Sequence, residues 1–166
     1  LQWSPAGLEE ILGPGPRTLV FLTNVRDPGN LGTVIRGADA AGADAVLVSA
    51  ASVDVTSPKV IRSTAGSIFH LPVVTGLDIE PTLAMLGEAG ITRLAADGAG
   101  SVTTDDADLT GPHAWVMGNE AWGLEEATLR ACDEVVRVPI HGQAESLNLA
   151  MASTICLYAS ARQQRA

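Results

Sequence analysis

Short apolar runs alternate with helix-length amphipathic segments along the chain, and this alternation is the strongest constraint on the fold. Strands joined through helices form right-handed crossovers, which favours an α/β fold with a mainly parallel sheet and helices on both faces. Strands are predicted at 18–25, 45–49, 71–74, 91–98, 113–118 and 134–140. Helices are predicted from Leu31 to Gly42, from Ser57-Pro58 onward, and at 81–90, 124–133 and 146–164.

The chain has 166 residues, enough for one domain that needs neither a metal nor a disulfide. Its composition, 46% hydrophobic but 4% aromatic, predicts a core of small aliphatic residues. Cys132 and Cys156 lie in apolar surroundings without a CxxC motif and are interpreted as buried free thiols. Residues 1–16 contain GPGP and are predicted to be a linker or lead-in to a domain at 17–166. Because the chain begins without Met, we expect an absent N-terminal partner domain.

The formal charge of −9 argues against a surface that binds nucleic acid over its whole area. Half of the ten basic side chains nevertheless lie in the first 62 residues, so an RNA substrate is expected to meet that part. The candidate RNA contacts are Arg26, Arg36, Lys59 and Arg62. The apolar stretches are too short for a membrane span and no signal peptide is recognisable, so a cytoplasmic protein is expected.

Ligands of parallel sheets bind beyond the carboxyl ends of the strands, which directs attention to three polar loops. They read NVRDPGNLG (24–32), GNEAWGL (118–124) and HGQAESLN (141–148). A nucleotide-phosphate loop is disfavoured, because Gly29 and Gly32 give only GxxG. Gly98-Ala99-Gly100 leads into a polar stretch rather than a helix.

The three loops match three motifs in order. N-x-x-D-x-x-N-x-G-x-x-x-R is matched by Asn24, Asp27, Asn30, Gly32 and Arg36. A small residue and glycine before x-E-x-x-G-L is matched by Met117, Gly118, Glu120, Gly123 and Leu124. A hydrophobic-Pro-hydrophobic step, then glycine and S-L-N, is matched by Val138, Pro139, Ile140, Gly142, Ser146, Leu147 and Asn148. With these motifs the chain resembles the SpoU (TrmH) branch of the SPOUT superfamily over residues 18–160.

The resemblance implies an S-adenosylmethionine-dependent methyltransferase acting on the ribose 2′-hydroxyl of RNA, ribosomal RNA more than transfer RNA. It also implies a homodimer, an N-terminal RNA-binding domain absent from this chain, and a C-terminal deep trefoil knot that forms the cofactor pocket. Methyl transfer from a sulfonium to a hydroxyl requires no metal. Apolar members of that pocket can equally be core residues. The cofactor-binding residues that it implies are Ala95, Ala96, Asp97, Met117, Gly118, Asn119, Gly123, Val138, Ile140, Gly142, Leu147 and Asn148.

By the same resemblance, the catalytic residues are Arg36, Asn30, Glu120, Ser146 and Asn148. The family assigns its arginine as general base, but a guanidinium stays protonated in proteins. Arg36 is therefore expected to orient a phosphate and stabilise negative charge, with water or phosphate as the base; a surface ion pair with Asp39 is the alternative. Asn24 and Asp27 are expected to brace the first loop, and Ser146 to cap the last helix.

Other interpretations remain open at this point. The chain can be a catalytically silent RNA- or nucleotide-binding domain of the same fold, or a knotted enzyme that methylates a base nitrogen. The last helix has an apolar stripe that includes Met151, Ile155 and Tyr158. This stripe either docks the helix on the core or forms a dimer interface.

Overall fold

The computed structural model describes residues 2–166 and contains a seven-stranded sheet in the order β3-β2-β1-β6-β4-β7-β5. Every neighbouring pair is parallel, so the predicted fold class is confirmed. The strands are β1 (Thr18–Leu22), β2 (Ala45–Ser49), β3 (Val73–Leu77), β4 (Thr92–Ala96), β5 (Val102–Thr103), β6 (His113–Met117) and β7 (Glu134–Arg137). The helices are α1 (Leu8–Leu12), α2 (Pro28–Ala41), α3 (Pro58–Ser63), the 3-10 turn η1 (Ser67–Phe69), α4 (Ile79–Glu88), α5 (Glu126–Ala131) and α6 (Leu149–Gln164).

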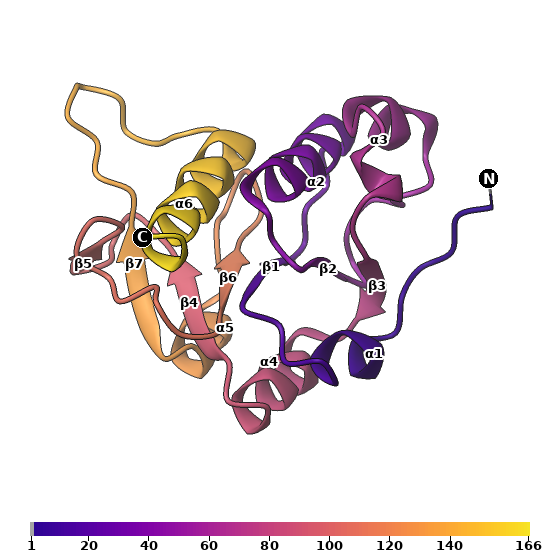
Figure 1. Cartoon of the computed structure of the whole chain (residues 1–166). Helices are drawn as coiled ribbons and strands as arrows, with labels where there is room; N and C mark the ends of the chain where they lie inside the picture. Colours follow the sequence, from indigo (N-terminus) through magenta and orange to yellow (C-terminus); the bar gives the residue numbers. More distant parts are fainter. Residues whose placement is uncertain (1) are drawn as a thin grey trace.

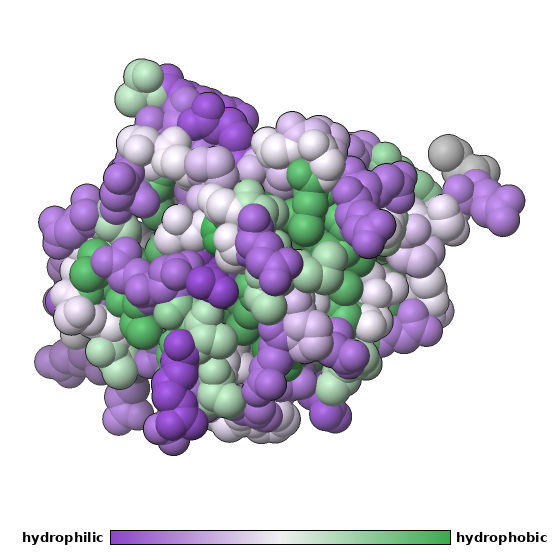
Figure 2. All heavy atoms as spheres, turned by 90° about the horizontal axis from the view of Figure 1, so that it is seen from below, coloured by the Kyte–Doolittle hydropathy of each residue, from purple (hydrophilic) through white to green (hydrophobic). Residues whose placement is uncertain are grey.

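The helices form a layer on each face of the sheet: α2, α3 and α6 on one, α1, α4 and α5 on the other (Figure 1). All of β1 is buried, and its side chains alternate between the two layers. Val20 and Leu22 belong to the core under α2 and α6, whereas Leu19 and Phe21 belong to the core under α1 and α4. The outer surface of the α1/α4 side mixes hydrophilic and hydrophobic residues (Figure 2).

The helix α6 docks through small side chains rather than through its apolar stripe. A Cβ atom on Gly37 of α2 would lie 2.6 Å from Oγ1 of Thr154, so glycine lets the two helices approach closely. Met151, Ile155 and Tyr158 point outward and are 58%, 40% and 47% exposed. The stripe therefore does not dock the helix. Its buried face consists of Ala150, Ser153, Cys156, Leu157, Ala159 and Ser160.

A buried polar cluster fixes α6 to the sheet. The Ser160 hydroxyl lies 2.6 Å from Nε2 of His113 and accepts a hydrogen bond of 2.8 Å from Nε1 of Trp115. Burial lowers the pKa of His113, because a charged imidazole would lose its hydration there. The neutral imidazole therefore belongs to the folded state.

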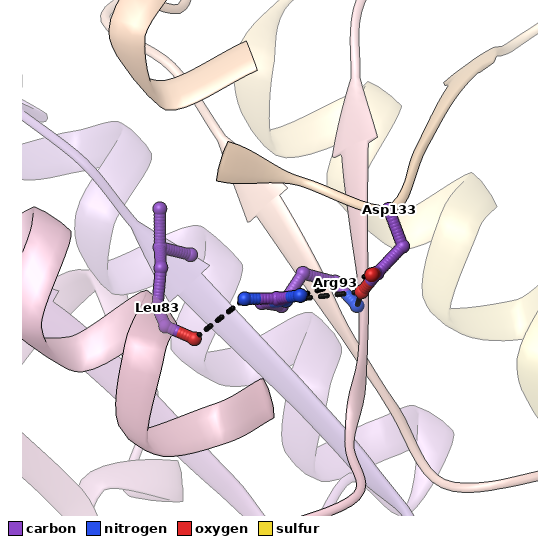
Figure 3. A network of polar contacts seen from close by, with 3 residues as sticks. All are labelled: Leu83, Arg93 and Asp133. Atoms are coloured by element: carbon purple, nitrogen blue, oxygen red, sulfur yellow. Dashed lines mark hydrogen bonds and ion pairs between the residues drawn. The ribbon is translucent and has the colours of Figure 1, made fainter. Parts of the chain in front are cut away.

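A second polar network holds the amino ends of β4 and β7 (Figure 3). The Arg93 guanidinium donates to both carboxylate oxygens of Asp133, at 2.9 and 3.0 Å, and to the Leu83 carbonyl of α4 at 3.1 Å. The bonds from Arg93 lower the pKa of Asp133. This network joins a strand, a helix and a loop, and its role is structural.

Several boundaries differ from the prediction. The helix α2 begins at Pro28, three residues before Leu31, because the Asp27 carboxylate caps it by accepting the Asn30 N–H at 2.7 Å. Within the expected linker, α1 forms and packs on the sheet, with Leu8 9% exposed. The strand β5 was not predicted. The trefoil knot implied by the resemblance stays a prediction.

Candidate functional site

A pocket of about 310 Å³ lies at the carboxyl ends of β4, β6 and β7, against the start of α6. The sheet order places these three strands side by side, so loops distant in sequence meet there. The pocket combines aliphatic walls with carboxylate, amide and hydroxyl groups. Its lining consists of Ala96, Asp97, Gly98, Met117, Gly118, Asn119, Glu120, Ala121, Gly123, Val136, Val138, Ile140, Glu145, Ser146, Leu147, Leu149 and Ala152.

Most residues expected to bind the cofactor line this pocket, together with Glu120 and Ser146 from the catalytic set. Ala95 does not: its side chain is fully buried in the core under α4, because successive strand residues point to opposite faces and Ala96 takes the pocket side. Gly142 and Asn148 also lie outside the lining. The predicted set that does line it is Ala96, Asp97, Met117, Gly118, Asn119, Gly123, Val138, Ile140 and Leu147.

The sequence motifs missed six lining residues. Leu149 and Ala152 are one turn apart on α6, so they share the helix face that meets the pocket. Val136 lies two residues before Val138 and shares its side of the chain. Helix and strand periodicity applied next to the motifs would have found these three. The other missed residues are Gly98, Ala121 and Glu145.

The loop after β6 requires glycine at its base. A Cβ atom on Gly118 would collide with the backbone of Gly123 and Leu124. Residues 119 and 123 exchange two backbone hydrogen bonds, of 3.0 and 2.9 Å, and Gly123 has φ +72°. Asn119 is engaged on both sides, since Nδ2 donates to the Asn24 carbonyl at 2.7 Å and Oδ1 accepts the Ala121 N–H at 2.7 Å. The side chain of Asn119 therefore holds the loop.

Glu120 anchors the first loop to this turn. Its carboxylate accepts the Asp27 N–H at 2.8 Å and the Arg26 N–H at 3.1 and 3.2 Å. Asp27 braces the loop through its cap of α2, as expected. Asn24 braces it through its backbone, in the left-handed region at φ 55°, where its N–H donates to Ser49 Oγ at 2.9 Å.

Asn30 and Asn148 meet across the mouth of the site. Nδ2 of Asn148 donates to Oδ1 of Asn30 at 3.0 Å, and Oδ1 of Asn148 accepts the N–H groups of Ala150 and Met151 at 2.9 and 3.2 Å. Asn148 is therefore the N-cap of α6, and the prediction that Ser146 has this role is wrong. Two residues further from the helix, Ser146 lines the pocket instead.

Arg36 lies on the exposed face of α2 and does not line the pocket. The alternative ion pair with Asp39 does not form: Asp39 accepts hydrogen bonds from Ser67 Oγ and His70 Nδ1, each at 2.7 Å. Those bonds, Ser67 first, lower the pKa of Asp39. Within residues 2–166, Arg36 has no hydrogen-bond or ion-pair partner, so its guanidinium can meet a ligand or another chain. Arg26, Lys59 and Arg62 are exposed too.

Both cysteines are free, as predicted, but only Cys156 is fully buried, whereas Cys132 is partly exposed. Burial raises the pKa of Cys132 to about 11 and that of Cys156 to about 12, so both thiols are protonated near neutral pH. No helix in the described part of the chain is long and apolar enough to cross a membrane. Residues 2–166 contain no group of three or more His, Cys, Asp or Glu side chains placed to hold a metal ion.

The protein is an α/β domain with a parallel sheet and a pocket at the carboxyl edge of that sheet. Glycines and the start of the C-terminal helix line the pocket, and the three motif loops are hydrogen-bonded to one another beside it. Comparison with known proteins gives the family. Residues 17–158 match the model of the SpoU rRNA methylase family. The chain belongs to this family.

Among its relatives, the 23S rRNA (guanosine-2'-O-)-methyltransferase RlmB of Pseudomonas syringae pv. tomato is 37% identical over 166 residues, 99% of this chain and 66% of the relative. An uncharacterized tRNA/rRNA methyltransferase of Mycobacterium avium is 35% identical over 158 residues, 95% of this chain and 51% of the relative. The SpoU methyltransferase AviRb from Streptomyces viridochromogenes, solved in complex with AdoMet, aligns with a TM-score of 0.90 and 34% identity, over 98% of this chain and 66% of that one. The chain thus spans no more than about two thirds of these relatives.

Proposed function

We propose that the chain is the catalytic domain, residues 17–166, of an S-adenosylmethionine-dependent methyltransferase that modifies the ribose 2′-hydroxyl of a nucleotide in ribosomal RNA. The observation that carries this is that the second and third motif loops line one pocket and the first loop is hydrogen-bonded to both, through Glu120 and Asn148. The relative from Pseudomonas syringae is named for this chemistry. A cytoplasmic protein follows from an rRNA substrate.

The pocket suits S-adenosylmethionine in size and chemistry. A volume of about 310 Å³ is at the lower end of small-molecule sites. Val138, Ile140 and Leu149 provide apolar walls for an adenine ring, and Asp97 offers a carboxylate for hydroxyl or amino groups. Gly98 has open space where a Cβ atom would lie, so its backbone is open to a ligand there. The structural neighbour AviRb binds this cofactor, which supports the assignment.

When bound, S-adenosylmethionine supplies an electrophilic methyl group, whose bond to sulfur breaks, leaving the electron pair on sulfur, as the ribose oxygen bonds to the methyl carbon. The residues of the chain have to orient the ribose, stabilise its developing negative charge and let the hydroxyl proton leave. Arg36 stabilises that charge and holds the adjacent phosphate. The proton passes to water, because the guanidinium has no free site to accept it.

Asn30 and Asn148 position the first loop against the pocket, and Glu120 fixes the backbone beside Arg26. Ser146 lines the cavity and is exposed, so it is available to the substrate or cofactor. Arg26, Lys59 and Arg62 add exposed positive charge for RNA phosphates. With a net charge of −9, this chain alone is expected to bind RNA weakly, so a further RNA-binding domain belongs to the proposal.

The active form is proposed to be a homodimer with composite sites. Arg36 lies outside the pocket of its own chain, on the helix that packs against α6. The exposed stripe of Met151, Ile155 and Tyr158 on α6 is an apolar surface that a second copy would cover. A dimer formed there would bring Arg36 of one protomer toward the pocket of its partner.

The test is incubation of the protein with S-adenosylmethionine carrying a labelled methyl group and with ribosomal RNA, followed by mapping of alkali-resistant linkages. A 2′-O-methyl group blocks alkaline cleavage, so label at one resistant linkage supports the proposal. Labelled RNA that is cleaved normally at the modified position would mean methylation of a base. Cofactor binding without any label in ribosomal or transfer RNA would indicate a catalytically silent domain.

A further inference from the structure

The indole of Trp122 is displayed on the surface beside the pocket. It is 57% exposed, whereas Trp115 is fully buried and Trp3 is partly buried against the core. The residues on either side of it, Ala121 and Gly123, line the pocket, but Trp122 does not. Its side chain therefore belongs to the rim, outside the volume proposed for the cofactor.

The backbone that carries this indole is fixed. Trp122 lies inside the turn closed by the paired hydrogen bonds of residues 119 and 123, and its own N–H donates to Asn119 Oδ1 at 3.3 Å. Asn119 is tied to the Asn24 carbonyl, and Glu120 to the Asp27 N–H. An aromatic side chain on a fixed turn loses little conformational entropy when a flat partner stacks on it.

The electrostatic setting favours an aromatic contact with RNA. A chain with a net charge of −9 has few cations for phosphates, and stacking on an indole needs none. The nearest acid in the sequence, Glu120, has its carboxylate engaged by the N–H groups of Arg26 and Asp27. The exposed Arg26 is thereby tied to the same turn and can meet the phosphate of the stacked nucleotide. Glu125 and Glu126 follow the turn and are exposed, so a neutral base fits better than an extra phosphate there.

We propose that Trp122 is a stacking site for an unpaired nucleobase of the RNA substrate, beside the nucleotide whose ribose is methylated. This inference rests on the proposed function and adds a contact that contributes to RNA affinity and to positioning of the target. Stacking of a base on an aromatic side chain contributes roughly 1–3 kcal/mol, or about thirty-fold in Kd at the middle of that range. The contact depends on the base, not on the phosphate.

The test compares Trp122→Ala, Trp122→Phe and the control Trp3→Phe. The probe is a short fluorescein-labelled single-stranded RNA, together with the same RNA made abasic at successive positions, and binding is measured by fluorescence anisotropy at low salt. Trp122→Ala should raise the Kd for the intact RNA about thirty-fold, and Trp122→Phe should retain most of the affinity. One abasic RNA should bind the parent protein as weakly as the intact RNA binds Trp122→Ala, and that RNA should not distinguish the two proteins.

Two outcomes would overturn the inference. One is a Trp122→Ala protein that binds the intact RNA with the same Kd as the parent protein. The same conclusion would follow if every abasic RNA showed the same difference in Kd between the two proteins. The other is a fall in molar mass from dimer to monomer in Trp122→Ala by sedimentation, which would assign the indole to the contact with a second copy. Calorimetric titration with S-adenosylmethionine distinguishes failure of the stacking inference from failure of the proposed function. The proposed function would be refuted if the parent protein neither bound the cofactor nor transferred methyl groups, whatever the effect of Trp122→Ala on RNA binding.

Discussion

Nδ2 of Asn148 and Oδ1 of Asn30 lie 3.0 Å apart and join the first and third motif loops across 118 positions of sequence. The other end of the Asn148 amide caps α6, so one side chain both starts the helix and holds the first loop against it. Glu120 ties the second loop to the first in the same way. The three loops are thus one hydrogen-bonded unit, and disturbing one contact should misplace residues in the others.

The two functions of Asn148 can be separated by Asn148→Asp. Aspartate caps helices as well as asparagine, but a carboxylate cannot donate to Asn30 Oδ1. We expect the free energy of unfolding to change by less than about 0.5 kcal/mol, while methyl transfer falls by at least about ten-fold. Chemical denaturation and methylation assays measure the two effects. Asn148→Ala, which loses the cap as well, should in addition lose about 1 kcal/mol of stability. Full activity in Asn148→Asp would show that the contact with Asn30 has no role in catalysis.

Replacement of Arg36 should remove catalysis without damage to the fold. The side chain is exposed and has no partner among residues 2–166, so Arg36→Ala should change stability by no more than about 0.5 kcal/mol. Methyl transfer should fall to background, because the charge that stabilises the ribose oxygen is gone. Affinity for S-adenosylmethionine, measured by calorimetry, should stay within about two-fold. Arg130→Ala is the control for a loss of exposed positive charge, because this arginine is 73% exposed and has only a surface ion pair with Glu126. A wild-type rate in Arg36→Ala would refute the assignment.

The composite dimer predicts complementation between two inactive variants. Arg36→Ala keeps its pocket and Gly118→Ala keeps its arginine, so a mixed dimer has one complete site. Co-refolded in equal amounts, the variants should recover about a quarter of the parental activity, because half of the dimers are mixed and one of their two sites works. Recovery should fail when either chain also carries Ile155→Asp, which puts a charge into the proposed interface. Phe69→Asp, also at an exposed apolar residue, is the control and should leave both dimer and activity intact.

Gly118 is expected to be irreplaceable for packing reasons alone. An added methyl group would overlap the backbone of Gly123, which cannot yield as a flexible side chain can. Gly118→Ala should therefore lower the free energy of unfolding by about 1–3 kcal/mol and abolish detectable cofactor binding. Gly111→Ala is the matched control, because open space surrounds its Cβ position. If Gly118→Ala bound S-adenosylmethionine like the parent, the loop would not be the rigid wall that the structure shows.

Periodicity predicted the parallel α/β class and six of the strands, because buried strands of four or five residues leave continuous apolar runs. It could not detect β5, whose two residues, Val102 and Thr103, are too few for a pattern. The segment with α1 was interpreted as a linker from its Gly and Pro content. Its packing depends on long-range contacts such as the hydrogen bond from the Ala6 N–H to the Val73 carbonyl, which no local signal reports.

The motifs located the site but not the direction of each side chain. Ala95 and Ala96 are the same residue type, so the sequence does not distinguish their side-chain directions. Only the register of β4 places Ala95 in the core under α1 and α4. Ser146 and Asn148 are both good capping residues, and the start of α6 decides between them. The exposed position of Arg36 follows from the packing of α2 on α3 and α6 rather than from its motif. What the sequence lacked in these cases was tertiary geometry.

His113 should make the stability of the fold depend on pH in the mildly acidic range. Burial lowers the pKa of His113 in the folded state below its ordinary value of 6.5, so below that pH the unfolded chain binds a proton that the folded chain does not. The free energy of unfolding should therefore be fully maintained above pH 6.5 and fall as the pH drops through this value toward the lowered pKa. Asp39 and Asp133, whose pKa values are lowered from 3.8, contribute a separate loss only in more acidic solution, since their stabilisation is present above 3.8.

Urea titrations between about pH 7 and about pH 5 should show this decline in the free energy of unfolding for the parent protein. His113→Gln should show a flatter profile, because glutamine cannot titrate but can still form a hydrogen bond with Ser160. The exposed His70 serves as control, because His70→Gln should keep most of the parental decline. An equal slope in the parent and His113→Gln would mean that the buried cluster at Ser160 does not govern this part of the pH profile.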